Sequence, residues 1–159
     1  MELLLDDIDR EILTLLQTNG RISNVELAHH INLSPPATLT RVRRLEKAGF
    51  IDGYVALVNR EKIGYDMICF VSVTLSLHQI EQVEYFRKAI QTIPQVLECH
   101  HVTGDYDYLL KVVVQNRQDL ERFVMAQLTP IKGVARIHTS LVLSEIKQTT
   151  ILDIPLSGD

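Results

Sequence analysis

The 159-residue sequence predicts an α+β protein: an N-terminal three-helix helix-turn-helix domain joined by a linking strand to a ferredoxin-like βαββαβ domain. Three observations predict this class. Apolar residues recur at helical spacing up to residue 50, the period changes to two from residue 67, and the later segments follow the order βαββαβ. We therefore expect a helix-turn-helix domain at 1–50, a linking strand at 51–64 and a ferredoxin-like domain at 65–159.

Capping residues mark the first two helices. Asp6 can cap a helix that ends before Gly20, because its carboxylate can accept from the free amides of the first turn. Ser23 and Glu26 have the spacing of a capping box, so the second helix should begin near Asn24.

A tight turn and a third helix follow. Asn32 tolerates the positive φ that such a turn needs, and Ser34 can cap a helix whose first residue is Pro35. Gly49 marks the end of that helix. Two short helices around a tight turn are typical of the helix-turn-helix that reads DNA.

The third helix is expected to have two different faces. At about 100° per residue, Thr38, Val42 and Leu45 would pack on the preceding helix. The opposite face and its flanks carry short residues near the helix start and cations later, as a helix in the major groove requires: Pro36, Thr40, Arg41, Arg43, Arg44 and Lys47. The alternative is that the arginines only complement the helix dipole. A structure with these arginines folded against their own subunit would contradict the DNA interpretation.

The charge and cysteine patterns fit a DNA-binding protein of a reducing compartment. The net charge is −4, yet the third helix concentrates positive charge. Cys69 and Cys99 lie in apolar, strand-like runs without a CxxC pair, which predicts buried thiols. The sequence shows no signal peptide or membrane span, so we expect a cytoplasmic, DNA-associated protein.

Alternating and helical runs define the second half. We expect strands at Met67–Leu77, Val96–Val102, Tyr108–Val114 and Val134–Leu143, and helices at Gln79–Ile93 and from Leu120 to Pro130. Further strands are expected at Ile51–Asn59 and Thr149–Ile154. Both helices of a ferredoxin-like domain cover the same face of the sheet, so the other face predicts a dimer.

The loop between the second and third of these strands could bind a free amino acid. Gly104 allows a turn whose amides form an anion-binding nest, and Asp105 or Asp107 could accept from an ammonium group. An ordinary glycine turn explains the same residues. Tyr106 could stack on a ligand or belong to the core. Thr139 and Ser140 are weaker candidates, because hydroxyls are common on half-buried strands.

Five segments of the chain resemble the Lrp/AsnC regulators, the leucine-responsive and feast/famine transcription factors of bacteria and archaea. These are RISNVELA, LSPP, RVRRLEKAGFI, TGDYDYLLK and LSEIKQTT, and the resemblance covers Leu5 to Ile154. It implies a dimerising ferredoxin-like domain, assembly of dimers into octamers or similar rings, and an amino-acid effector, with leucine the first choice. It also implies DNA contacts at Ser34, Pro36, Thr40, Arg41 and Arg44, and effector contacts at residues 104–107.

Two other interpretations remain open. An enzyme is one, because part of a similar family decarboxylates tetrapyrroles and polar groups are available at His100, His101, Asp105, Asp107 and Arg136. The sequence has no nucleophile motif or phosphate loop, so we expect no enzyme and no cofactor. Adjacent strand histidines point to opposite faces, so we expect no metal site. The other interpretation is a sensor that regulates another protein through its sheet domain and uses its helical part for protein contact.

Overall fold

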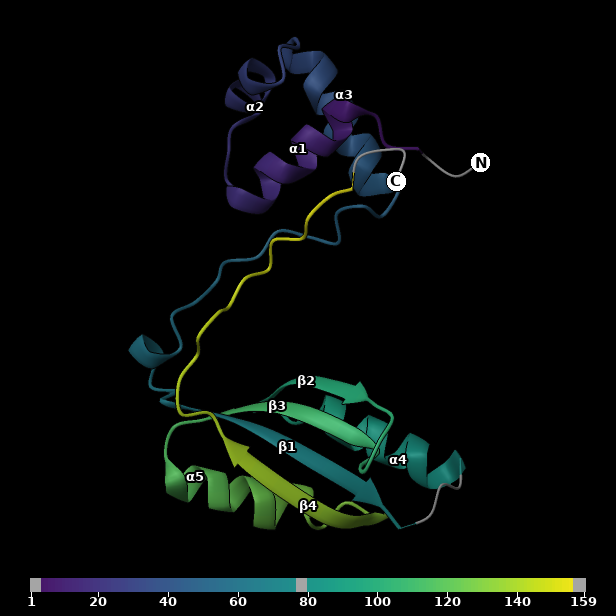
Figure 1. Cartoon of the computed structure of the whole chain (residues 1–159), viewed down its shortest axis with the longest axis vertical. Helices are drawn as coiled ribbons and strands as arrows, with labels where there is room; N and C mark the ends of the chain where they lie inside the picture. The colour runs from purple at the N-terminus through teal and green to yellow at the C-terminus, as the bar shows by residue number, and fades with distance from the viewer. Residues whose placement is uncertain (1–3, 77–79, 156–159) are drawn as a thin grey trace. The chain divides into compact units, whose positions relative to one another are not determined.

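The chain forms two compact units in the computed structural model, which describes residues 4–76 and 80–155 (Figure 1). Unit 1 comprises Met1–Leu57 together with Lys147–Asp159, and unit 2 comprises Val58–Ile146. The C-terminal tail therefore returns to the N-terminal unit.

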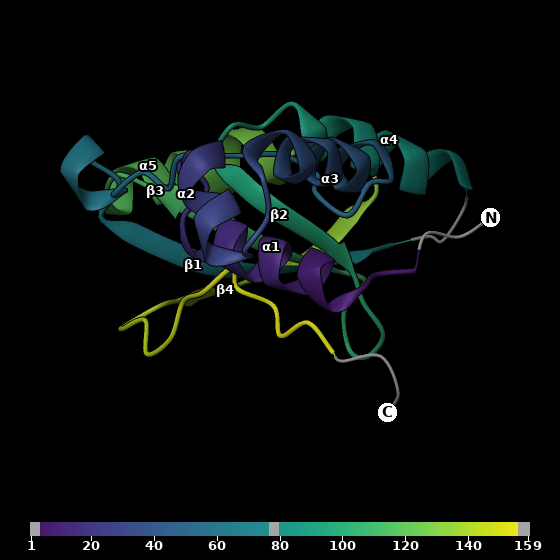
Figure 2. The same ribbon diagram turned by 90° about the horizontal axis from the view of Figure 1, so that it is seen from above.

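Unit 1 contains the three expected helices (Figure 2). They are α1 (Asp7–Thr18), α2 (Asn24–His30) and α3 (Pro35–Lys47). Asp6 and Ser23 both make capping boxes, and the Ser34 hydroxyl accepts from the amide of Ala37. Asn32 has a φ of +52°, so the tight turn has the conformation that the sequence predicts.

A small apolar core holds unit 1 together. Ile12, Leu27 and Leu45 are at most 2% exposed and meet at its centre. The tail contributes Ile154, which packs on the same core. The tail is fixed by Gln17. Its side-chain Nε2 donates to the Leu152 carbonyl at 3.0 Å, and its Oε1 accepts from the Leu152 amide at 2.7 Å.

Unit 2 is a four-stranded antiparallel sheet in the order β2-β3-β1-β4, which confirms the ferredoxin-like fold. Its elements begin with a 3₁₀ turn, Glu61–Ile63 (η1), and continue as β1 (Met67–Leu75), α4 (Ile80–Gln91), β2 (Val96–His101), β3 (Tyr108–Val114), α5 (Arg117–Arg122), a π-helical segment Phe123–Leu128 (η2), and β4 (Val134–Leu141).

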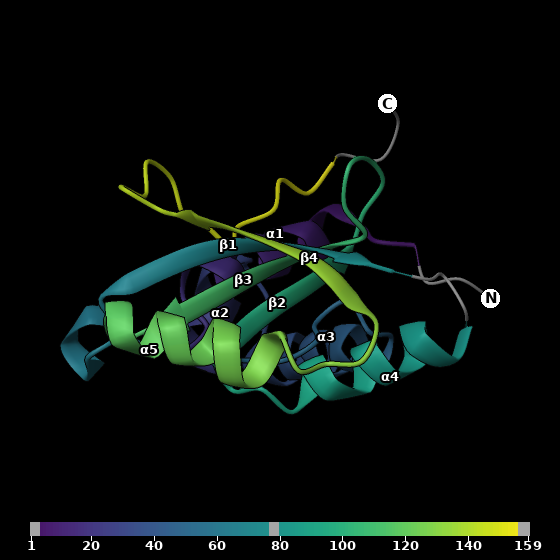
Figure 3. The same ribbon diagram turned by 90° about the horizontal axis from the view of Figure 1, so that it is seen from below.

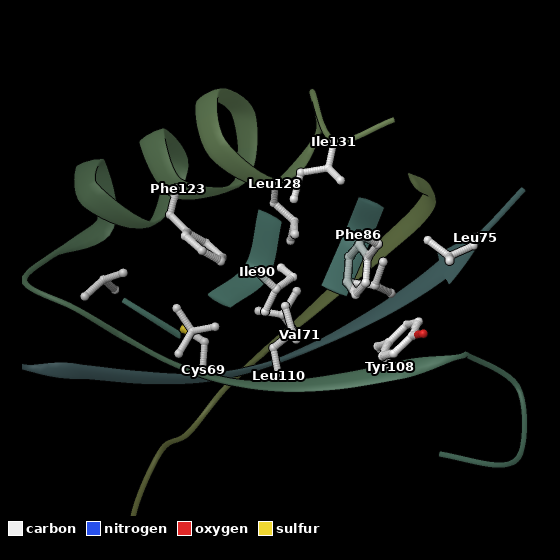
Figure 4. Close-up of a cluster of buried hydrophobic side chains, with 13 residues drawn as sticks. Cys69, Val71, Leu75, Phe86, Ile90, Tyr108, Leu110, Phe123, Leu128 and Ile131 are labelled. Carbon is white, nitrogen blue, oxygen red and sulfur yellow. The ribbon is translucent and has the colours of Figure 1, made fainter. Parts of the chain in front are cut away.

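The two helical stretches of unit 2 lie on one side of the sheet (Figure 3). Phe123 and Leu128 from the α5 side and Ile90 from α4 point toward Val71 and Leu110 on the sheet (Figure 4). These five side chains are at most 4% exposed. On the opposite face, Ile68 and Val113 are at most 6% exposed, whereas Phe70 is 40% exposed, so that face is only partly covered within the described chain.

Some expectations from the sequence were wrong. Residues 51–59 and 149–154 are not strands, because a strand needs a backbone partner and the described chain supplies none to either segment. Cys99 is exposed on β2, which lies at the sheet edge, whereas Cys69 is buried as expected. Leu77 and Gln79, the expected strand end and helix start, lie outside the described residues.

None of the helices within residues 4–76 and 80–155 is long and apolar enough to cross a membrane.

Candidate DNA interface and effector loop

The outward face of α3 starts with short side chains. Ser34, Pro36 and Thr40 are exposed, and the Thr40 hydroxyl donates to the Pro36 carbonyl at 2.9 Å. Arg43 and Lys47 are also exposed, and both lie within about 40° of Pro36 at about 100° per residue. This face is narrow near the helix start and cationic further along, which suits a major groove.

The other two arginines of α3 pair with α1. Arg44 Nη2 donates to both carboxylate oxygens of Asp9, at 2.7 and 2.6 Å, and Arg41 Nη1 donates to Asp9 Oδ1 at 2.9 Å. Arg41 Nη1 also donates to Asp6 Oδ2 at 2.7 Å. Asp9 is completely buried, whereas the side chains of Arg41 and Arg44 are 27% and 42% exposed. These four residues are called the Asp9 cluster below.

The ion pairs shift the ionisation of the partly exposed members. Burial alone would raise the pKa of Asp6, but hydrogen bonds from the Arg41 guanidinium and from the Asp9 amide outweigh it and lower that pKa. The same hydrogen bond to Asp6 raises the pKa of Arg41. Both groups are therefore held in their charged forms.

The cluster corrects one expectation about α3. The outward placement of Arg44 was wrong, because its guanidinium is turned toward α1, and Arg43 occupies the middle of the outward face instead. The arginines are thus divided: Arg41 and Arg44 are held by their own chain, and Arg43 is not paired in any described contact. The sequence did carry a signal for this, since Asp9 falls on the apolar stripe of α1, where a carboxylate needs a cation.

The expected effector loop is a turn with an exposed tip. Gly104 has a φ of +123°, a conformation that side chains with a Cβ rarely adopt, and a Cβ built there would meet no atom within 4 Å. Residues 103–105 are exposed and Tyr106 is half-buried. Asp105 is therefore free to face a ligand from the loop tip.

Asp107 has a different role from Asp105. Its Oδ2 accepts from the Leu75 amide at 2.7 Å, and its own amide donates to the Val73 carbonyl at 3.0 Å. The carboxylate therefore ties the loop to β1, at a residue 32 positions away along the sequence.

The structure does not bring Thr139 and Ser140 to one site. On β4 they pair with the β1 residues Val71 and Phe70 respectively. Val71 is fully buried under the helices and Phe70 is on the exposed face, so the two hydroxyl groups point to opposite sides of the sheet.

The strand histidines diverge as the sequence predicts. His100 Nε2 lies 3.1 Å from Glu98 Oε2, and the His101 ring stacks on Tyr108 with centroids 5.0 Å apart. Tyr108 is 2% exposed and belongs to the core. Among residues 4–76 and 80–155, no three His, Cys, Asp or Glu side chains form a group that could hold a metal ion.

Two family models match the two halves of the chain. Residues 5–52 match a winged helix-turn-helix DNA-binding domain, and residues 68–152 match the Lrp/AsnC ligand binding domain. The matches correspond to the helical part of unit 1 and to the sheet of unit 2 with part of the tail.

Relatives of known name and structure cover nearly the whole chain. The leucine-responsive regulatory protein of Escherichia coli is 43% identical over 148 residues, which are 93% of this chain and 90% of that protein. A transcriptional regulator from Neisseria meningitidis, solved as a complex with L-Met, is 37% identical with a TM-score of 0.91, covering 94% of this chain and 97% of that one. An AsnC family regulator from Agrobacterium tumefaciens is 30% identical with a TM-score of 0.88, covering the same shares.

Proposed function

Because the chain belongs to the Lrp/AsnC family of DNA-binding transcriptional regulators, we propose that the exposed face of α3 enters the major groove and that an amino acid bound by unit 2 controls this binding. The chain combines a helix-turn-helix domain with an amino-acid-binding domain and is a regulator, not an enzyme. The observation that carries the proposal is the unpaired, exposed face of α3.

The proposed DNA contacts follow the exposure of α3. Ser34, Pro36 and Thr40 allow close approach near the helix start, and Arg43 and Lys47 supply cations for guanine edges or phosphates. Arg41 and Arg44 were expected to contact DNA as well, but the Asp9 cluster occupies them.

A gel-shift series tests this assignment. Arg43→Ala should weaken binding to a selected duplex by about 1 to 3 kcal/mol if the guanidinium reads a base, and the matched control Arg122→Ala removes an exposed arginine from unit 2. If both variants bind like the wild type, α3 does not contact DNA through this face.

We propose that the effector contacts the loop 103–107. Asp105 would accept from the ammonium group and the amides beside Gly104 would donate to the carboxylate, with Tyr106 alongside. Asp107 supports the loop through Leu75.

Leucine remains the first candidate effector. The 43% identical relative is named leucine-responsive, while the structural neighbour from Neisseria meningitidis was solved with L-Met. Both are apolar amino acids of similar length, so the proposed class is an amino acid with an unbranched or γ-branched apolar side chain. Thermal shift against the twenty amino acids tests this, and stabilisation by polar amino acids alone would reject it.

We also propose a dimer formed through the open face of the sheet, with dimers assembling further into octamers or similar rings. Phe70 is 40% exposed there, and the neighbouring Leu109 on β3 lies on the same face. A two-fold dimer would place two α3 helices on successive major grooves of a pseudo-palindrome. Sedimentation of Phe70→Glu should then give monomers where the wild type gives dimers or larger assemblies.

A further inference from the structure

The Asp9 cluster has no place in the contacts proposed so far. It joins the first turn of α1 to the middle of α3 through two carboxylates and two guanidinium groups, so its formal charges cancel. Of the four basic residues on α3, only Arg43 and Lys47 therefore remain uncompensated by a described ion pair.

The cluster should persist when DNA approaches. Asp9 is completely buried, so releasing Arg44 to a phosphate would leave a carboxylate without water or a full set of donors. The bond to Arg44 uses both carboxylate oxygens, which makes it stronger than a single contact. By contrast, Asp6 is 50% exposed and could be rehydrated.

We infer that Asp9 is a positioning residue that limits non-specific affinity: it withholds the guanidinium groups of Arg41 and Arg44 from DNA phosphates while fixing α3 on α1. This inference rests on the proposed function, since it assumes that α3 meets DNA. Phosphate contacts strengthen binding to every sequence alike, so withholding two cations lowers the salt-dependent, sequence-independent part of the affinity and leaves the ratio of specific to non-specific affinity unchanged.

The salt dependence of DNA binding tests this inference. We would compare the full-length variants Asp9→Asn and Asp7→Asn, which lose the same charge from the same helical turn, although Asp7 is exposed and makes no described contact with an arginine. On a random-sequence duplex, Asp9→Asn should steepen the slope of log affinity against log salt by about 1 to 2 per chain relative to Asp7→Asn. Between 50 and 200 mM salt, that adds a roughly three- to twelvefold loss of affinity per chain.

The ratio of affinities for a selected duplex and for the random duplex should stay the same within about twofold in Asp9→Asn, because released guanidinium groups would contact phosphates of both duplexes. A larger fall in this ratio would mean that α3 had moved on its base contacts, and it would overturn the inference. A purely structural role would weaken binding to both duplexes without changing the salt slope, so equal slopes in Asp9→Asn and Asp7→Asn would overturn the inference.

A second variant keeps the test valid if Asp9→Asn folds poorly. The glutamine of Arg44→Gln can still donate to Asp9. Because Arg44 is held away from phosphates in the wild type, the variant should have the same slope of log affinity against log salt as the wild type. A slope lower by about 0.9 would place Arg44 on a phosphate and refute the inference. Arg43→Ala in the same assay reports on the proposed function separately, because it should weaken binding to the selected duplex whether or not Asp9 acts as inferred.

Discussion

Replacing Gly104 with valine should abolish the response to the effector and leave DNA binding intact. The φ of +123° at this position lies outside the conformations that a β-branched residue adopts readily. A Cβ would meet nothing within 4 Å, so the substitution causes no clash, and its cost is backbone strain of about 1 to 3 kcal/mol. The loop tip is exposed and can relieve this strain by turning its amides away from the site, while the core of unit 2 stays intact.

The measurement is a thermal shift with the amino acid that most stabilises the wild type, followed by gel shifts with and without it. Gly53→Val is the matched control, because it is the same change at an open position without a positive φ. We expect no amino-acid shift for Gly104→Val and a normal shift for Gly53→Val. A Gly104→Val protein that still responds normally would show that the loop does not hold the effector.

Three further predictions concern unit 1. Leu45→Ala removes a fully buried side chain and should destabilise unit 1 by about 3 kcal/mol, measured by urea unfolding followed by circular dichroism; a change below about 1 kcal/mol would contradict the packing. Gln17→Ala removes both hydrogen bonds to Leu152 and should lower the free energy of unfolding of unit 1 by about 1 kcal/mol, because the site is partly solvated. The tail should also become more sensitive to limited proteolysis. Unchanged digestion would mean that other contacts hold the tail. The pKa of Asp6 lies below its ordinary value of 3.8, so its carboxylate adds stability above pH 3.8 that is lost as the pH falls through the lower, folded-state pKa. Asp6→Asn should remove that part of the dependence of unfolding free energy on acid pH. An identical dependence in the variant and the wild type would refute the prediction.

Local chemistry explains why the fold was largely predictable from the sequence. Each helix of unit 1 begins at a side chain that satisfies its free amides, and capping depends only on residues within one turn, as at Ser23 and Glu26. The alternation of Val71 and Val73 with Ser72 and Thr74 likewise records which face of β1 is buried.

Features that depend on distant partners were not predictable in the same way. Residues 51–59 have a strand-like composition, but composition does not supply the backbone partner that a strand requires. The division of the arginines depends on Asp9, which is 35 residues from Arg44 along the sequence. In the expected effector site, the sequence could locate the turn at Gly104 but could not show that the Asp107 carboxylate binds the Leu75 amide.

The return of the tail to unit 1 sets an order for biosynthesis. Ile154 leaves the ribosome after all of the sheet domain, yet it packs beside residues that were among the first to emerge. Unit 1 is therefore the first part of the protein to be synthesised and the last to be completed. A nascent chain should complete the core of the unit that carries α3 only after the whole sheet domain has been synthesised.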